Sequence, residues 1–411
     1  MTATPTGTGT RRLTLSTGEI SRARLKVLFL TNWYPTPEEP AKAVWVREQA
    51  KAVQLYDDVR VLHGAGPDAT LSTSWRSAPE TNERLSEGVP TYRVWYRPSP
   101  LPHASYLLYC WSIWRSVRRL AQEGFRPDVI HVHIYDAGGP AVLLGRLSRI
   151  PVVVTEQFSS FPRRLLGRLD LAKAWLAFRW AHVVIPVSQA LQRAIERYGL
   201  HARFRVIPNV ADTTLFSPVS SFAQDDDPKR LLFIGQLVPV KGIPDLLRAV
   251  ALLLQKRMDW HLDIVGEGAA RPEYERLAAD LKLYDRVTFH GLKTRQQVAD
   301  FLRRADLFVL PSLCETFSVP AIEALATGIP VLATRCGGPE EFVGTEVGAL
   351  VPPGDPSALC QGLDYMLDHL ILYSRPQIAR YARDRFSPEV VGAQLHAVYQ
   401  SVIPTPGPVG R

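Results

Sequence analysis

Two glutamates stand eight residues apart, on either side of a segment that could bind phosphate. Glu315 lies in a polar stretch after an apolar run of strand length, and Glu323 follows Pro320. Because proline is favoured at the start of a helix, we expect a helix from Pro320 to Ala326, capped by Ser318, with Glu323 in its first turn. Free amides at a helix start bind anions, and carboxylates bind hydroxyls. The spacing favours a ligand that carries a diphosphate and hydroxyl groups. The same pattern would arise without a ligand if Glu323 complemented the helix dipole and Glu315 were a solvated loop residue.

Two glycine loops follow other apolar runs in the same half of the chain. Gly235 precedes Lys241, and Gly337 and Gly338 follow Cys336. Glycine lets a ligand approach the backbone closely, and a lysine can meet a phosphate. Either loop alone is as well explained by an ordinary surface turn. Their combination with the glutamate pair indicates a phosphate site.

A further group of polar residues lies in the first half of the chain. His131 and His133 end the run that begins at Asp128, and a strand would place both on one face. Glu156 and Ser188 stand at the ends of two later runs. These side chains could face a ligand, or backbone groups could satisfy the two histidines.

Short apolar runs rich in β-branched residues recur along the chain, with helix-length segments between them. Most runs do not alternate, as expected for parallel strands buried on both faces. The runs expected to form strands are Leu25–Leu30, Val59–Leu62, Val129–Val132, Val152–Thr155, Val183–Val187, Arg205–Ile207, Leu231–Ile234, Leu262–Val265, Val287–Phe289, Leu307–Leu310 and Val331–Ala333. Segments expected to be helical include Val44–Leu55, Ser105–Glu123, Ala137–Ser148, Ile243–Leu254, Pro272–Leu281 and Thr294–Arg304. The alternation predicts doubly wound α/β sheets.

The alternation stops and restarts, which predicts two α/β domains in tandem. The polar stretch from Gln224 to Lys229 contains no apolar residue and is the best candidate for a break. We predict a disordered tail over residues 1–23, a first domain over 24–210, a linker over 211–229 and a second domain over 230–385, followed by a helix over 388–403. Ligands of such domains bind in the crevice at the carboxyl ends of the strands.

Composition excludes several classes of protein. The 411 residues are 46% apolar and 21% charged, as in a globular chain and unlike a disordered one. We find no apolar run of membrane-spanning length and no signal-peptide core at the start. The four cysteines form no CxxC pair, so a reducing cytoplasm is expected. The net charge of +8 suits an anionic partner.

Two segments of the first half combine arginines with aromatic residues. Ser105–Arg119 and Phe161–Trp180 each have the pattern of a basic amphipathic helix. Such helices can lie on an anionic membrane surface, although buried core faces with solvated arginines would give the same pattern. No nucleic-acid partner is expected, since no recognition motif accompanies the positive charge.

Taken in order, these motifs resemble glycosyltransferase family 4. The E-x7-E motif is matched by Glu315 and Glu323, and the glycine–lysine motif is matched from Gly235 to Lys241 except at Gln236, where the family usually has arginine. The resemblance extends from about Lys26 to Val402. It implies the GT-B fold, in which two Rossmann-like domains face each other across a crevice and a C-terminal helix crosses back to the first. It also implies a retaining transferase that uses a nucleotide sugar.

The resemblance implies roles for individual residues. Glu323 would hold the donor ribose, Glu315 the transferred sugar, and Lys241 the diphosphate. Gly291 and Leu292 would lie beside the base. The full set of expected donor contacts is Gly235, Gln236, Lys241, Gly291, Leu292, Glu315, Thr316, Phe317, Ser318, Val319 and Glu323. A neutral amide at position 236 cannot replace a bidentate cation, which puts the strength of catalysis in question.

In the first domain, the resemblance favours His133 as a catalytic residue that polarises the transferred sugar or the acceptor hydroxyl. Together with Glu315 and Lys241, it completes the expected catalytic set. Lys42, Glu156 and Ser188 are the expected acceptor contacts, although Glu156 could instead orient a neighbour.

The expected partners are a UDP- or GDP-linked sugar, an acceptor that is a glycan, a lipid-linked sugar or a small molecule, and an anionic membrane surface. No cofactor and no metal are expected, because no Asp-x-Asp follows a strand-like run and amides with Lys241 can stabilise a leaving diphosphate. The expected location is the cytoplasm, with peripheral contact to the inner membrane face. Two alternatives stay open: a non-hydrolysing nucleotide-sugar epimerase, and a non-catalytic sugar-nucleotide-binding subunit.

Overall fold

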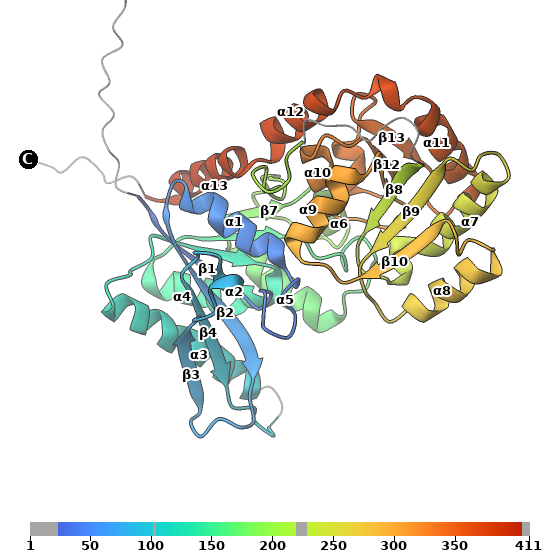
Figure 1. The fold of residues 1–411 in the computed structure, drawn as a ribbon. Helices are drawn as coiled ribbons and strands as arrows, with labels where there is room; N and C mark the ends of the chain where they lie inside the picture. The colour runs from blue at the N-terminus through green and yellow to red at the C-terminus, as the bar shows by residue number, and fades with distance from the viewer. Residues whose placement is uncertain (1–23, 102–103, 219–227, 405–411) are drawn as a thin grey trace, which may run out of the picture.

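A computed structural model describes residues 24–101, 104–218 and 228–404. The predicted tail over 1–23 and residues 219–227 of the predicted linker lie outside the described residues. The described chain forms two sheets with helices on both faces of each, as Figure 1 shows. This arrangement confirms the predicted fold class of two doubly wound α/β units.

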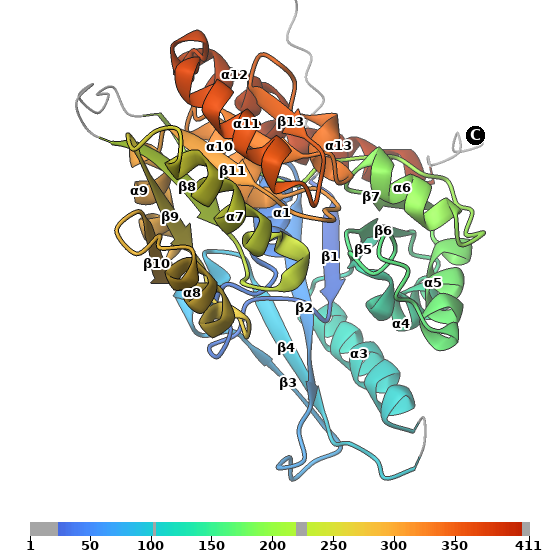
Figure 2. The same ribbon diagram turned by 90° about the vertical axis from the view of Figure 1, so that its right-hand side faces the viewer.

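The first sheet has seven strands in the order β3-β4-β2-β1-β5-β6-β7. The strands are β1 (Lys26–Thr31), β2 (Asp58–Pro67), β3 (Trp75–Pro79), β4 (Thr91–Tyr96), β5 (Val129–His133), β6 (Val152–Glu156) and β7 (Val183–Pro186). All neighbours pair in parallel except β3, which is antiparallel to β4 at the edge. Figure 2 shows β2, β3 and β4 extending away from the rest of the molecule beside α3 (Ala104–Gln122).

Successive residues along β1 pack on opposite faces of the first sheet. Val27 and Phe29 of β1 lie in the core under α1 (Val44–Gln54) and α13 (Pro388–Val402). Leu28 and Leu30 pack on the other side, with α3, α4 (Gly138–Ser148) and α5 (Arg168–Trp180). Burial on both faces explains why the apolar runs are continuous. The short helices α2 (Glu83–Ser86), η1 (Tyr135–Ala137) and α6 (Gln189–Glu196) complete this unit.

The second sheet has six parallel strands in the order β10-β9-β8-β11-β12-β13. The strands are β8 (Lys229–Ile234), β9 (Trp260–Val265), β10 (Val287–Gly291), β11 (Leu307–Leu310), β12 (Val331–Thr334) and β13 (Gly348–Val351). One face packs on α7 (Ile243–Leu254), α8 (Arg271–Asp280) and α11 (Pro356–Asp368). The other packs on α9 (Arg295–Arg304), α10 (Val319–Ala326) and α12 (Arg375–Phe386), and this core is continuous with that of the first unit. The short helices are η2 (Pro239–Lys241), η3 (Gly338–Glu341) and η4 (Leu370–Leu372).

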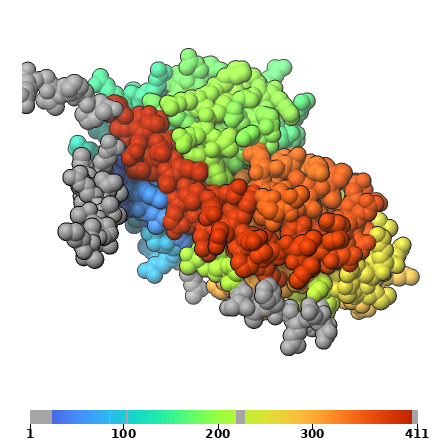
Figure 3. All heavy atoms as spheres, turned by 90° about the horizontal axis from the view of Figure 1, so that it is seen from above, coloured from blue at the N-terminus to red at the C-terminus, as the bar shows by residue number. Residues whose placement is uncertain are grey.

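The C-terminal helix α13 returns to the first unit, which confirms the predicted crossing. It packs along α1, where Gly392 lies so close to the Ala52 carbonyl that a Cβ atom would be 2.3 Å from the oxygen. The Tyr399 hydroxyl lies 2.7 Å from Nδ1 of His131. In Figure 3 the C-terminal residues run over both the blue-green first unit and the orange second unit.

Some expected elements differ from the observed ones. The run Arg205–Ile207 is not a strand, and its neighbourhood forms a single bridge between Phe204 and Val184. Arginines at its start keep this segment half exposed. Strands β3, β4 and β13 were not predicted, because they lie toward sheet edges where residues are partly exposed and no continuous apolar run is needed.

Candidate active site

The loop after β11 brings two of the predicted residues into contact. Oε1 of Glu315 accepts hydrogen bonds from Nζ of Lys241 at 2.6 Å and from the Ser312 hydroxyl at 2.8 Å. Glu315 is buried, and Lys241 ends the short helix η2 after β8. The ion pair holds the lysine at the carboxyl edge of the second sheet, where it could also reach a diphosphate.

The start of α10 departs from the prediction. The helix begins at Val319, so Glu323 lies in its second turn rather than its first. Ser318 precedes the helix, but its side chain makes no capping hydrogen bond, and its φ is 95°. This conformation is strained for a residue with a side chain, and such strain is concentrated at functional sites. A tight turn at Ser318, rather than a side-chain cap, leads the chain into α10.

The predicted glycine loops allow close backbone approach. A Cβ atom on Gly338 would lie 2.4 Å from the Thr316 carbonyl oxygen and 2.5 Å from Cα of Phe317. The glycine loop therefore packs directly on the Glu315 loop. At the other loop, Gly266 has a φ of 142° and lies against the Gly235 carbonyl, which leaves no room for a side chain.

The remaining predicted donor contacts border this loop cluster in different ways. Phe317 is buried against Phe342 at a ring distance of 5.1 Å, so only its backbone is available to a ligand. Gly291 ends β10 with a φ of 71°, and the Leu292 side chain after it is exposed. Gln236 is also exposed.

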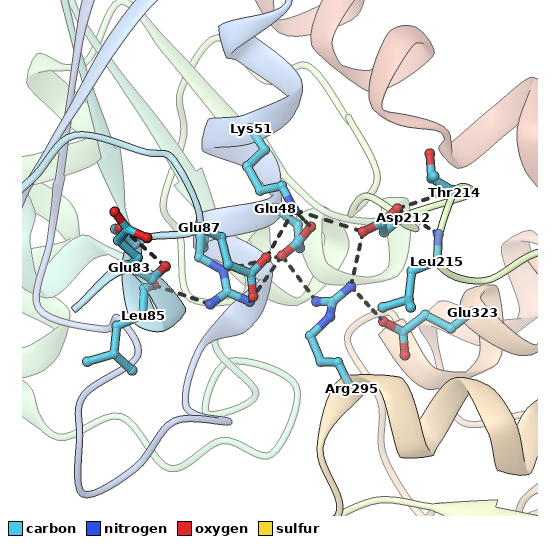
Figure 4. Close-up of polar contacts among 12 residues, drawn as sticks. Glu48, Lys51, Glu83, Leu85, Glu87, Asp212, Thr214, Leu215, Arg295 and Glu323 are labelled. Atoms are coloured by element: carbon cyan, nitrogen blue, oxygen red, sulfur yellow. Dashed lines mark hydrogen bonds and ion pairs between the residues drawn. The ribbon is translucent and has the colours of Figure 1, made fainter.

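Glu323 is buried beside a residue that the motifs do not include. Nη2 of Arg295 lies 3.8 Å from Oε1 of Glu323, and Figure 4 shows this arginine among Glu48, Asp212 and Glu323. Burial raises the pKa of Glu323 to about 7, and Arg295 opposes the rise. The sequence signal for Arg295 was its position shortly after Gly291, at the start of a predicted helix.

The two histidines at the end of β5 have different surroundings. His131 contacts Tyr399 through Nδ1 and the Thr155 hydroxyl through Nε2, each at 2.7 Å. His133 is buried between ring neighbours, and neither ring nitrogen has a hydrogen-bond partner among the described residues. Burial lowers the pKa of His133 to about 3, so its imidazole is neutral at pH 7. His131 is therefore held by two hydrogen bonds, whereas both ring nitrogens of the fully buried His133 are unpaired within the described chain.

The predicted acceptor contacts are engaged in local structure. Both carboxylate oxygens of Glu156 accept backbone bonds, from the N–H groups of Tyr135, Gln157 and Phe158 at 2.8–3.1 Å. The Ser188 hydroxyl caps α6 by accepting from the Leu191 N–H. These two buried side chains organise the loops after β5, β6 and β7, and neither is exposed to an acceptor.

Lys42, the third predicted acceptor contact, lies in the turn after β1. Its ammonium group is 2.5 Å from the Glu39 carboxylate and 5.4 Å from the centre of the Trp33 ring. The lysine is partly exposed, and this ion pair anchors it to its own turn.

A pocket that the sequence did not reveal opens at the carboxyl edge of the first sheet. Its volume is about 390 Å³, and its lining residues are Asn32, Gly64, Ala65, Gly66, Tyr96, Tyr106, Tyr109, Asp136 and Lys173. Oδ2 of Asp136 accepts from the Trp33 indole at 3.2 Å, and Oδ1 has no partner within the described chain. Burial raises the pKa of Asp136 to about 6. No short motif links these residues, since they come from six separate segments.

Three contacts join the carboxyl edges of the two sheets. The Thr316 hydroxyl donates to the Gln157 carbonyl at 3.1 Å. The Glu341 carboxylate accepts from the N–H groups of Gln189 and Ala190 at the start of α6. Arg295 pairs with Glu48 of α1 at 3.1 Å. The Glu315 loop therefore lies against the strand ends that carry His133 and Gln157.

No group of three or more His, Cys, Asp or Glu side chains in residues 24–101, 104–218 and 228–404 could hold a metal ion. No helix in the same ranges is long and apolar enough to cross a bilayer.

Comparison with known proteins identifies the family. Residues 27–215 match the family Glycosyltransferase Family 4, and residues 219–385 match Glycosyl transferases group 1. A D-inositol 3-phosphate glycosyltransferase of Corynebacterium jeikeium (strain K411) is 30% identical over 311 residues, which cover 69% of this chain and 74% of the relative. The chain belongs to glycosyltransferase family 4. Its motifs had predicted this membership and a transferase activity.

Other relatives of this glycosyltransferase extend over nearly its full length. A putative teichuronic acid biosynthesis glycosyltransferase, TuaC of Bacillus subtilis (strain 168), is 28% identical over 415 residues, which cover 93% of this chain and all of the relative. Among solved structures, HepE of Anabaena in complex with UDP-glucose has a TM-score of 0.73 at 21% identity, covering 92% of this chain and 100% of HepE. The structural likeness establishes the GT-B fold.

Proposed function

We propose that this glycosyltransferase moves a sugar, with retention of anomeric configuration, from a nucleotide-diphosphate sugar to an acceptor hydroxyl. One observation carries the proposal: Thr316 of the Glu315 loop donates to Gln157 of the first unit. This contact brings Glu315, the residue before Thr316, to the strand ends where the buried side-chain atoms of His133 and Gln157 have no partner in the described chain. Buried polar atoms are costly unless a hydrogen bond satisfies them, and sugar hydroxyls would supply such bonds.

The donor would bind on the second unit. The amides that open α10, together with Lys241, suit a diphosphate, and Glu323 suits ribose hydroxyls. Gly291 and Leu292 would border the base. A UDP or GDP donor is proposed, and the structural neighbour that binds UDP-glucose supports the first choice. Lys241 and the amides could stabilise the leaving diphosphate without a metal.

In the proposed reaction, the acceptor oxygen bonds to the anomeric carbon on the face from which the diphosphate departs. The bond from that carbon to the diphosphate oxygen breaks, and its electron pair stays on the diphosphate. The same phosphate group takes the proton of the acceptor hydroxyl. Neutral His133 would accept or donate one hydrogen bond to the transferred sugar and so fix its position.

The acceptor would enter the pocket at the first sheet. Its volume of about 390 Å³ is sufficient for a sugar unit, and its lining combines tyrosine rings with Asn32, Asp136 and Lys173. Tyrosine faces pack on sugar rings, while Asn32 and Asp136 suit hydroxyl groups. Lys173 would favour an acceptor with a phosphate or carboxylate nearby, such as a lipid-linked sugar.

The outer face of α4 and α5 supports the proposed contact with an anionic membrane. Leu147 of α4 is 71% exposed and Trp175 of α5 is 53% exposed. A hollow of about 830 Å³ beside them is lined by Arg146, Arg149 and Arg179 without any acidic residue among its described lining. Basic and apolar side chains together suit anionic lipid head groups. Co-sedimentation with phosphatidylglycerol vesicles at low salt tests this, and no binding would refute it.

A product assay tests the proposed activity. Thermal shifts with UDP, GDP and ADP would select the base, and the matching nucleotide sugars would then be incubated with candidate acceptors, with and without EDTA. We expect an α-configured product from an α-configured donor, formed equally well in EDTA. An inverted product would refute retention, and rescue by Mg²⁺ would refute metal independence. Epimerised donor formed without acceptor would instead support the epimerase alternative.

A further inference from the structure

A cluster of buried and partly buried charges connects the two units beside the proposed donor site (Figure 4). Nη1 of Arg295 lies 3.1 Å from Oε1 of Glu48, a residue of α1 in the first unit. Nη2 lies 3.8 Å from Oε1 of Glu323 and 3.9 Å from Oδ2 of Asp212. The Glu48 side chain is only 5% exposed and that of Arg295 is 22% exposed. One guanidinium group therefore contacts carboxylates from both units.

Local structure fixes the position of this arginine. A capping box between Thr294 and Gln297 sets the start of α9, so that Arg295 is the first residue of the helix. The guanidinium also lies 5.4 Å from the centre of the Phe216 ring, which limits its movement. The arginine is thus held between the two units before any ligand binds.

The other two cations of the cluster belong to α1, and one of them, Lys51, also lies 3.9 Å from Oδ2 of Asp212. Arg47 and Lys51 each pair with Glu48, at 3.3 Å, and with Glu87. Within the described chain, Arg295 is the cation that lies within 4 Å of the Glu323 carboxylate. The charge on Glu323 therefore depends on Arg295.

We propose that Arg295 is a positioning residue that keeps Glu323 ionised and oriented for the donor, and that Glu48 holds it from the opposite unit. The proposal rests on the proposed role of Glu323 in donor binding. It makes nucleotide affinity sensitive to a charge on α1, which belongs to the acceptor side of the crevice. Separation of the two units would remove that charge from the donor site.

The charges around Glu323 predict how its ionisation changes in variants. Burial is the largest cause of the rise of the Glu323 pKa to about 7, Arg295 from α9 opposes the rise, and Glu48 from α1 and Asp212 from the segment before β8 add to it. Nucleotide affinity should rise as the pH rises through this value, because the carboxylate accepts hydrogen bonds from ribose hydroxyls. Loss of the arginine charge would move the midpoint to higher pH. Loss of the Glu48 charge would move it to lower pH.

The test measures nucleotide binding by titration calorimetry from pH 6 to pH 9, using UDP or GDP, whichever raises the melting temperature more. The variants are Arg295→Met, Arg295→Lys and Glu48→Gln, with Arg304→Met as a control that removes an exposed charge from the same helix. The nucleotide's own ionisation is common to all variants and cancels between them. At pH 7 we expect Arg295→Met to weaken binding on the order of tenfold, with recovery by pH 9.

The variants from the two units should shift the midpoint in opposite directions. Arg295→Lys should keep the wild-type midpoint, because it retains the charge, and Arg304→Met should behave as the wild type. Equal midpoints in Arg295→Met, Glu48→Gln and the wild type would overturn the proposal. If Arg295→Met fails to fold, the Glu48→Gln shift still decides the question.

Glu323→Gln separates this proposal from the proposed function. Unchanged nucleotide affinity in Glu323→Gln would refute the donor role of Glu323. It would also refute the proposed coupling of Arg295 and Glu48 to nucleotide binding through Glu323. Weakened binding in Glu323→Gln, together with unchanged midpoints in the Arg295 and Glu48 variants, would overturn the coupling alone.

Discussion

The proposed donor and acceptor sites satisfy their polar groups differently. In the proposed donor site, Lys241 forms a hydrogen-bonded ion pair with Glu315, and Arg295 forms ion pairs with Glu48 and Glu323, although its Nη2 atom has no hydrogen-bond partner in the described chain. On the acceptor side, buried atoms of His133, Gln157 and Asp136 have no hydrogen-bond partner in the part of the chain that the structure describes. A paired site keeps its geometry before the ligand arrives, whereas an unpaired one depends on the ligand for its hydrogen bonds. We therefore expect Lys241 and Glu315 to keep their geometry without a ligand, and the proposed acceptor site to be more sensitive to its substrate.

Replacement of His133 by alanine should have the largest effect. Donor affinity should stay within about twofold, because the histidine lies in the first unit, while kcat should fall roughly 100- to 10,000-fold through loss of a polar contact to the reacting groups. Steady-state kinetics and nucleotide calorimetry would separate the two quantities. His131→Ala is the matched comparison, and we expect it to lower the melting temperature because it breaks the contacts with Tyr399 and Thr155. Wild-type turnover in His133→Ala would remove it from the active site.

On the donor side, Lys241→Gln should lower kcat/KM roughly 100- to 1,000-fold, since one cation that stabilises the leaving diphosphate is lost. The amide can still donate to Glu315, so the fold should survive. Binding of UDP should weaken more than binding of UMP, because the lysine is proposed to contact the diphosphate. Equal losses for UDP and UMP would contradict that role and leave Lys241 as a partner of Glu315 alone.

Much of the fold could be predicted because buried parallel strands leave continuous apolar runs. The helix predicted over Ile243–Leu254 has the observed bounds of α7, and the helix-like stretch Pro388–Val402 is α13. Strand β3 was missed because it is an antiparallel edge strand in which every residue is at least partly exposed and no apolar run occurs. Apolar runs in the sequence indicate buried strands, and an edge strand buries too few residues to produce such a run.

The candidate site could be predicted to a smaller extent. Glu315 and Lys241 were recognised because each lies in its own motif, yet their ion pair spans 74 residues and no spacing rule encodes it. Arg295 and Glu48 come from different units and form no motif at all. The acceptor predictions for Glu156 and Ser188 rested on their positions at strand ends. Those positions also attract side chains that hold the loops, which is what both residues do here.

Asp136→Asn tests whether the unpaired acceptor side binds substrate. The acceptor KM should rise about tenfold at pH 7, since one charged hydrogen bond is replaced by a neutral one, while nucleotide affinity is unchanged. Burial raises the pKa of Asp136 from its usual value near 4 to about 6, so the wild-type carboxylate loses its charge as the pH falls through 6. The wild-type acceptor KM should therefore rise between pH 7 and pH 5, and that of Asp136→Asn should not. Asp285→Asn, at an exposed position in the second unit, is the control. Identical pH profiles for the wild type and Asp136→Asn would rule out this pocket residue as an acceptor contact.

The smallest expected effect is a gain on the donor side. Gln236 is exposed beside Gly235, where the family usually has arginine, and a guanidinium can contact a phosphate through two hydrogen bonds. Because the position is solvated, Gln236→Arg should tighten UDP binding only about two- to fivefold, and the gain should shrink as salt is added. Gln236→Lys is the matched variant. It adds the same charge without a planar guanidinium group, so its gain in UDP affinity should be smaller. Calorimetry with UDP at two salt concentrations measures both variants. If neither variant binds UDP more tightly than the wild type, position 236 does not face the diphosphate in this enzyme, and Lys241 with the α10 amides is left as the complete phosphate site.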